Sequence, residues 1–334
     1  MFVPQKQFLI NQMYPLKFKP ILKQRLWGGE KILSFKHLDD KLSNVGESWE
    51  ISSVDDSESV VANGEYRGRT LPQLVREFKD VLVGESNYHH FGDTFPLLIK
   101  FIDAQQDLSI QVHPSDELAK KRHHSLGKTE MWYVVGAEPG AKLRSGFSKQ
   151  ITPKEYKEHV ANDTITDVLQ EYEIHEGDVF FLPAGRIHSI GAGAFVAEIQ
   201  ETSDITYRIY DFNRKDANGN TRELHTEMAK DAIDYEVQTD YRTSYVKEKN
   251  EPVELVACPY FTTSLYDVDE EVSCDYSELD SFVVLMCLDG SCTLKTDNED
   301  PVEMHAGETV LISAENNEVT IIPHDQAKLL ESYV

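Results

Sequence analysis

The chain has 334 residues and a mass of 38.1 kDa, which is enough for about two domains. Its 33 Lys and Arg face 58 Asp and Glu, a net charge of −25, which excludes nucleic acid and anionic membranes as general partners. A small anionic substrate is not excluded, because it responds to the local field. No run of about 18 apolar residues occurs, so we expect no transmembrane helix and a cytoplasmic protein.

The first twelve residues, MFVPQKQFLINQ, lack the pattern of a signal peptide, because no basic region leads into a long apolar run. A more regular segment, MYPLKFKP, starts at Met13. We therefore expect residues 1–12 to be an N-terminal extension.

Three segments predict helices, each from a recognisable start. Pro72 stands at the first turn of a segment with apolar residues at helical spacing. Ser115 is a good N-cap, and Thr152 followed by Glu155 forms a capping box. The predicted helices span 71–82, 115–122 and 152–160.

Most other apolar segments predict short strands. They are six to ten residues long, and Gly, Pro, Asn or Asp bound them, which favours a sandwich or barrel. The clearest strands are predicted at 96–102, 131–136, 178–183, 194–200, 281–290 and 308–313.

A polar stretch at 213–255 separates two parts of the chain, and we place the junction near 245–253. The predicted units are 13–250 and 251–334. The second unit alternates strands and turns like a small β jelly roll. Its two histidines, His305 and His324, are expected to lie apart in turns, so we predict no metal there.

Four residues of the larger unit suit a divalent metal such as zinc. Gln111 and His113 are two apart in an extended run, so their side chains share one face of a strand. Glu130 stands just before a predicted strand, and His188 ends the pattern G-x5-P-x-G-x2-H. Two imidazoles, a carboxylate and an amide oxygen are ligands that zinc accepts.

That pattern is the second motif of the cupin family, with Ala192 in place of the usual Asn. In the first cupin motif Gln111 replaces a histidine, and the Glu follows only after an inserted helix. The runs RLWGG, GESWEIS, QVHP, GKTE, PAGRIH and TYRIYDF closely resemble the type I mannose-6-phosphate isomerases (phosphomannose isomerases) in their short form. The resemblance implies a mainly β fold: a cupin-type jelly-roll catalytic domain with a few helices, plus a smaller C-terminal β jelly roll.

The resemblance also implies roles for individual residues. Lys128 matches the active-site lysine of the family and Arg208 its catalytic arginine, while Ser109, Glu198 and Arg214 match pocket positions less closely. We rank Glu198 ahead of a zinc-bound hydroxide as the catalytic base, and the residues leave that choice open. The implied ligands of one zinc ion per chain are Gln111, His113, Glu130 and His188.

The implied reaction interconverts mannose 6-phosphate and fructose 6-phosphate through an enediol(ate). The expected partner is this small sugar phosphate, and the sequence leaves open a monomer or a homodimer. Two rivals remain: a non-haem Fe(II) oxygenase, which also uses two His and a carboxylate, and a sugar-phosphate sensor on the same fold. Gln111 argues against the first rival because it fills a position that oxygen would need. The retained Lys128 and Arg208 argue against the second.

Overall fold

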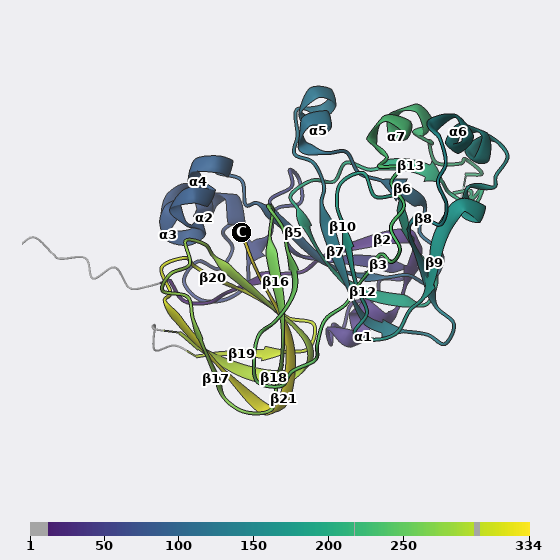
Figure 1. The fold of residues 1–334 in the computed structure, drawn as a ribbon. Helices are drawn as coiled ribbons and strands as arrows, with labels where there is room; N and C mark the ends of the chain where they lie inside the picture. The colour runs from purple at the N-terminus through teal and green to yellow at the C-terminus, as the bar shows by residue number, and fades with distance from the viewer. Residues whose placement is uncertain (1–12, 217, 297–300) are drawn as a thin grey trace, which may run out of the picture.

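The computed structural model describes residues 13–216, 218–296 and 301–334, and the expected extension at 1–12 lies outside these ranges. Within them, no helix is long and apolar enough to cross a membrane. The fold consists of three antiparallel sheets flanked by short helices (Figure 1). The predicted mainly β class is confirmed.

Two of the sheets form the larger unit. One has seven strands and the other five. Across the seven-stranded sheet the order is β14 (Arg242–Thr243), β10 (Val179–Leu182), β7 (Glu130–Ala137), β12 (Ala194–Glu201), β5 (Leu97–Asp103), β3 (Val45–Ile51) and β2 (Ile21–Gly29); across the five-stranded sheet it is β13 (Tyr207–Tyr210), β6 (Ile110–Val112), β11 (His188–Ile190), β8 (Lys142–Phe147) and β9 (Leu169–Glu173).

The two sheets share an apolar core, which makes the larger unit a β sandwich of the jelly-roll kind. Trp132 on β7 and Val196 on β12 pack in one buried cluster with Leu143 on β8 and Ile190 on β11. Alternate side chains of a strand point to opposite faces. The neighbours Tyr133 and Ala197 therefore leave this core and enter a second one behind the seven-stranded sheet.

The third sheet belongs mostly to the C-terminal part of the chain. It also takes in two short strands from the first 61 residues, because β1 pairs with both β20 and β4. The order is β15 (Val253–Ala257), β16 (Thr262–Val268), β21 (Glu318–Tyr333), β18 (Val283–Thr296), β20 (Thr309–Ile312), β1 (Leu16–Lys19) and β4 (Val60–Val61), with β17 (Val272–Asp275) on β21 and β19 (Val302–His305) on β18.

The expectation that His305 and His324 lie in turns was wrong. His305 is the last residue of β19 and His324 lies within β21. Both strands pair with the long strand β18, which brings His324 to 2.9 Å from the Thr293 hydroxyl. His324 Nε2 also lies 3.0 Å from the Glu303 carboxylate. The two histidines therefore sit on a strand surface.

Two of the three predicted helices formed as expected, and the third is broken. Thr152 and Glu155 make the predicted capping box, and Ser115 caps its helix through the backbone N–H of Leu118 at 3.4 Å. The segment 71–82 is interrupted at Lys79, whose φ of 51° is not helical. The helices are α1 (Lys31–Phe35), α2 (Leu71–Phe78), α3 (Asp80–Val83), α4 (Glu85–Phe91), α5 (Asp116–His123), α6 (Pro153–Ala161) and α7 (Thr226–Ala232), with a 3₁₀ turn at Ile165–Val168.

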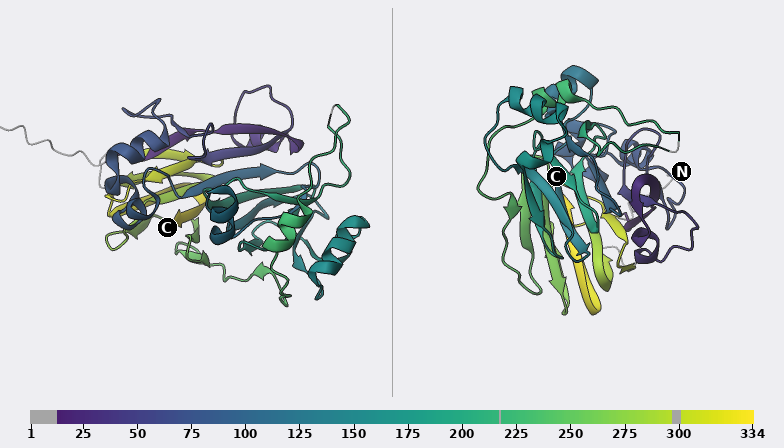
Figure 2. Two further views of the ribbon diagram at one scale, coloured as in Figure 1. Left: turned by 90° about the horizontal axis from the view of Figure 1, so that it is seen from above. Right: turned by 90° about the vertical axis from the view of Figure 1, so that its right-hand side faces the viewer.

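One continuous core joins the two parts of the molecule. Side chains on the back of the seven-stranded sheet, such as Phe101 and Ile199, pack in one cluster with Phe282, Met286 and Leu330 of the C-terminal sheet. The C-terminal strands and helices α2–α4 lie at one end of the molecule, and α6 and α7 lie at the other (Figures 1 and 2). We propose that the two units span residues 13–250 and 251–334. Strand β1 belongs to the first unit by sequence but pairs with β20 of the second.

Candidate metal and substrate site

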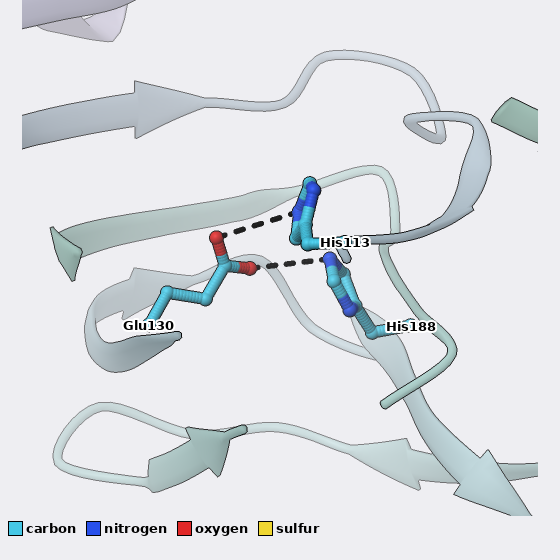
Figure 3. A group of neighbouring side chains, drawn as sticks. All are labelled: His113, Glu130 and His188. Atoms are coloured by element: carbon cyan, nitrogen blue, oxygen red, sulfur yellow. Dashed lines mark ion pairs between the residues drawn. The ribbon is translucent and has the colours of Figure 1, made fainter. Parts of the chain in front are cut away.

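Two histidines and a glutamate converge between the sheets of the larger unit. His113 follows β6, Glu130 begins β7 and His188 begins β11. One ligand atom from each lies within 4.8 Å of the other two, and all three side chains are buried. The Glu130 carboxylate lies 3.5 Å from His113 Nε2 and 3.1 Å from His188 Nε2 (Figure 3). In the described ranges, this is the one group of three such side chains.

Strand pairing brings Gln111 and Arg208 to the same place. His188 on β11 stands opposite Gln111 on β6, and Gln111 stands opposite Arg208 on β13. Directly paired residues have neighbouring side chains on one face of a sheet. The Gln111 amide nitrogen is accordingly 3.3 Å from His188 Nε2. Sequence positions 111, 188 and 208 thus form one row across three strands.

The hydrogen bonds of the two histidines aim their Nε2 atoms at Glu130. His113 Nδ1 lies 2.8 Å from the Ile205 carbonyl oxygen, and His188 Nδ1 lies 2.8 Å from that of Arg186. A carbonyl only accepts, so each Nδ1 carries a proton, and in a neutral imidazole the Nε2 atom then offers its lone pair.

Lone pairs and a carboxylate facing one another need a cation between them. His113 Nε2 and both carboxylate oxygens of Glu130 are buried and have no hydrogen-bond partner among the described residues. Buried polar atoms are almost always paired, so this convergence of unpaired acceptors fits a metal ion. Nitrogen and oxygen donors in this number suit zinc.

Lys128 adds a positive charge beside the cluster. Its ammonium lies 3.3 Å from Glu130 Oε2. Burial opposes the charge of Lys128, but Glu130 and Glu198 nearby raise its pKa overall. Burial would raise the pKa of Glu130, yet Lys128, His113 and His188 hold it well below its usual range. Burial, with Lys128 second, lowers the pKa of His113 well below its usual value, which favours a neutral imidazole.

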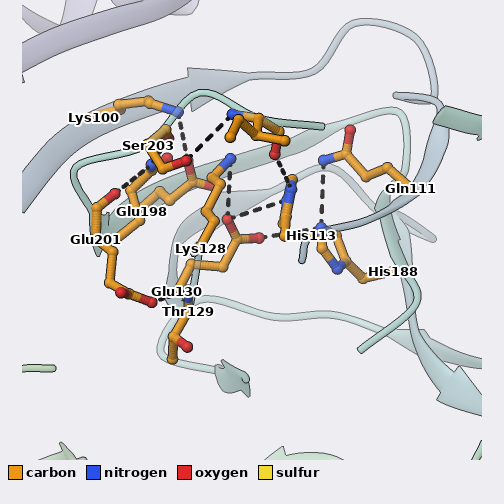
Figure 4. Close-up of polar contacts among 12 residues, drawn as sticks. Lys100, Gln111, His113, Lys128, Thr129, Glu130, His188, Glu198, Glu201 and Ser203 are labelled. Atoms are coloured by element: carbon orange, nitrogen blue, oxygen red, sulfur yellow. Dashed lines mark hydrogen bonds and ion pairs between the residues drawn. The ribbon is translucent and has the colours of Figure 1, made fainter. Parts of the chain in front are cut away.

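Glu198 is held in a second row of paired residues, on the seven-stranded sheet. Trp132 on β7 stands opposite Glu198 on β12, and Glu198 stands opposite Lys100 on β5. The Trp132 indole donates to Glu198 Oε2 at 2.7 Å. The Lys100 ammonium donates to Oε1 at 2.8 Å (Figure 4). Each carboxylate oxygen has two lone pairs, so each keeps one for a further partner.

All residues of the two rows except His188 line one cavity of about 440 Å³. Its wall holds Ser109, Gln111, Lys128, Glu198 and Arg208 from the predicted site. Five cationic side chains face three carboxylates there, so the cavity is locally positive in a chain of net charge −25. Such a field attracts an anionic substrate. The charged lining residues are Arg25, Lys100, Lys128, Arg208, Arg222, Glu47, Glu198 and Asp204.

Arg214 is the predicted pocket residue that does not line this cavity. Its guanidinium donates to Asp211 Oδ1 at 2.6 Å, behind the wall. Arg222 and His225, which the sequence analysis did not single out, line the cavity instead. Their segment reads as a polar loop, and nothing in its local pattern points to a cavity. The sequence could have indicated Lys100 as a cavity residue, because it is the one charged residue inside the apolar run PLLIKFI.

Comparison with known proteins agrees with this geometry. Residues 15–169 match the family described as phosphomannose isomerase type I, catalytic domain, and residues 252–334 match mannose-6-phosphate isomerase, cupin domain. The chain is similar to mannose-6-phosphate isomerase ManA of Bacillus subtilis, with 35% identity over 78% of this chain and 81% of the relative. It is also similar to the mannose-6-phosphate isomerase of Streptococcus mutans, with 34% identity over 77% of this chain and 80% of that relative.

Among solved structures, the chain resembles the mannose 6-phosphate isomerase of Bacillus subtilis. The TM-score is 0.86 at 30% identity, and the match covers 96% of this chain and 100% of the solved one. The similarity therefore includes both the larger unit and the C-terminal sheet.

Proposed function

Because this chain belongs to the type I phosphomannose isomerases and is a mannose-6-phosphate isomerase, we propose that it works with one zinc ion and isomerises its substrate through an enediol(ate). The observation that carries the proposal is the set of buried acceptor atoms on His113 and Glu130 that have no hydrogen-bond partner among the described residues and lie beside a positively lined cavity. The reaction converts mannose 6-phosphate into fructose 6-phosphate and back.

The proposed ligands are Gln111, His113, Glu130 and His188. Each histidine is fixed by a backbone carbonyl on its other ring nitrogen. When bound, zinc supplies Lewis-acid stabilisation for the negative charge that develops on the substrate oxygens. Lys128 lies beside Glu130, and its charge offsets that of the carboxylate.

The isomerisation moves a proton between C2 and C1 of the sugar, so a base must face the cavity. We propose Glu198 for this role, as the carboxylate that Lys100 and Trp132 hold in a fixed orientation on the cavity wall. A base held at a fixed position is effective because it need not be ordered during the reaction.

Lys128 and Arg208 are the proposed contacts to the anionic parts of the substrate. Both line the cavity, and a guanidinium or ammonium stabilises developing negative charge on oxygen. Ser109 lines the cavity and can hydrogen-bond a sugar hydroxyl. Arg214 acts through Asp211 in this scheme. A cytoplasmic location and a monomer or homodimer complete the proposal.

The enediol(ate) route makes a prediction about hydrogen exchange. Wild-type protein is incubated with mannose 6-phosphate in D₂O, and the fructose 6-phosphate formed is analysed by NMR. Deuterium at C1 supports removal of the C2 proton by a base that exchanges with solvent. Complete transfer of the C2 hydrogen to C1 would indicate a hydride shift and contradict the proposal. Glu198→Gln should lose kcat while it keeps its metal, and an unchanged kcat would remove Glu198 from the base role.

A further inference from the structure

Three arginines gather around a single carboxylate at the Arg208 end of the cavity. Arg222 donates from Nε to Asp211 Oδ2 at 2.7 Å and from its NH2 nitrogen to Oδ1 at 2.5 Å. Arg214 donates to the same Oδ1 at 2.6 Å. Arg208 lies close enough that the positive charges of Arg222 and Arg214, after burial, lower its pKa. The group carries two more positive charges than Asp211 neutralises.

The donors of this group are only partly used. Arg222 has five N–H donors, and Asp211 takes two of them, so three remain on a side chain that lines the cavity. Arg208 donates from NH1 to the Glu223 carbonyl at 3.1 Å, and its buried Nε has no hydrogen-bond partner among the described residues. Unused donors and an excess of positive charge call for an anion with several acceptor oxygens.

A phosphate monoester matches both the excess positive charge and the number of unused donors. It carries nearly two negative charges at neutral pH and three strong acceptor oxygens. Arg208 is the outermost member of the row that runs through Gln111 to His188, so the arginines lie at the end of that row away from His188. A sugar phosphate has the same polarity, with its reacting carbons remote from its phosphate.

We propose that Arg222 is a substrate-binding residue that donates to the phosphate group, and that Asp211 positions it. The inference rests on the proposed function, because it takes the sugar phosphate as the cavity's occupant. It adds a residue to the predicted site, because neither the sequence motifs nor the comparisons single out Arg222. Asp211 is buried, and its two bonds to Arg222 hold the fork in one orientation.

Kinetics on two substitutions of one residue test this role. The zinc-loaded wild type, Arg222→Gln and Arg222→Lys are assayed with mannose 6-phosphate, with inorganic phosphate as a competitive inhibitor. Arg222→Gln should raise KM and the inhibition constant of phosphate together, by about tenfold or more, while kcat stays within a few-fold. Arg222→Lys keeps the charge and should show a smaller rise in both. Arg144→Gln is the control: it loses ion pairs to Asp107 and Glu171 outside the cavity and should leave KM unchanged.

The outcomes separate this inference from the proposed function. If KM and the phosphate constant do not move in Arg222→Gln, or if kcat alone falls, the binding role is overturned. If Arg222→Gln fails to fold, the same two constants in Arg222→Lys decide. If the wild type does not turn over mannose 6-phosphate, the proposed function fails instead. Calorimetric binding of inorganic phosphate then tests Arg222 alone: weaker binding in the variants supports it, and equal binding contradicts it.

Discussion

Each of the two β units buries a glutamate, and the surroundings of the two side chains differ. Glu130 in the larger unit is surrounded by Lys128 and two histidines, which hold its pKa well below the usual range against the effect of burial. Glu331 in the C-terminal sheet is also buried, and burial raises its pKa. Its Oε1 accepts a hydrogen bond from the Tyr276 hydroxyl at 2.5 Å.

A buried glutamate is a candidate metal ligand in one unit and a structural side chain in the other. The oxygens of Glu130 have no hydrogen-bond partner among the described residues and lie beside a cavity, as a metal ligand requires. Glu331 is satisfied by hydroxyl donors inside a closed core, with Tyr266 and Cys274 nearby. The charge of the neighbours, more than the depth of burial, separates the candidate ligand from a structural side chain.

Removing a ligand from the larger unit should have the largest effect. His113→Ala and His188→Ala each delete one of the nitrogens that face Glu130, so we expect loss of bound zinc and of measurable turnover. Metal analysis and a coupled isomerase assay measure the two together. His89→Ala, on an exposed helix face, is the control. A variant that kept both zinc and turnover would remove that histidine from the site.

Arg208→Lys should give the next largest effect. Lysine retains the charge but lacks the two parallel hydrogen bonds of a guanidinium. We expect kcat/KM to fall by about 10²-fold, because the contact is proposed to tighten in the transition state. Zinc content should stay near one per chain. An unchanged kcat/KM would demote Arg208 to an ion-pair role, and a joint loss of zinc and activity would make it a support of the metal site.

A substitution of the buried glutamate in the C-terminal sheet should change stability and spare catalysis. The folded-state pKa of Glu331 is raised, so the folded chain holds its proton longer than the unfolded chain does. Stability from this group is therefore present at low pH and is lost as pH rises from the unfolded pKa through the folded one, by at most about 1.4 kcal/mol per pH unit.

Glu331→Gln should remove this loss. Urea unfolding at pH 5 and pH 8 would then differ less in the variant than in the wild type, with kcat unchanged. Glu254→Gln, at an exposed position, is the control. An identical pH dependence in Glu331→Gln and the wild type would contradict the assignment of the raised pKa to Glu331.

The smallest effects are expected at the strand-surface histidines of the C-terminal sheet. His305→Ala and His324→Ala should each change the free energy of unfolding by about 0.5 kcal/mol, since surface contacts contribute little. His324 is partly exposed, and its substitution removes contacts to Ser291, Thr293 and Glu303. Isomerase kinetics should stay within a few-fold of the wild type. Loss of bound metal in either variant would mean that this sheet takes part in the metal site.

The sequence was sufficient to single out the proposed metal ligands, because they carry a motif. The spacing that ends at His188 fixes a turn and a strand start, and Gln111 and His113 needed only the period of two in a strand. Pairing across β6, β11 and β13 then explains why Arg208, far away in the chain, joins them.

Other features depend on contacts that no local pattern encodes. The pairing of β1 with β20 joins residues near the two ends of the chain, and a four-residue strand of alternating apolar and basic residues does not specify its partner strand. The break at Lys79 is a backbone conformation that the apolar spacing of 71–82 does not reveal. Arg222 lines the cavity while Asp211 holds its guanidinium, and the polar loop around it does not encode either contact.

Isomerase activity is proposed to depend on a metal held by His113, Glu130 and His188. The direct measurement is the rate of mannose 6-phosphate isomerisation by wild-type protein before chelator treatment, after it, and after zinc is added back, with metal content determined each time. We predict one zinc per chain at the start, loss of activity with the metal, and recovery in proportion to the zinc rebound. A metal-free preparation with full activity would contradict the account.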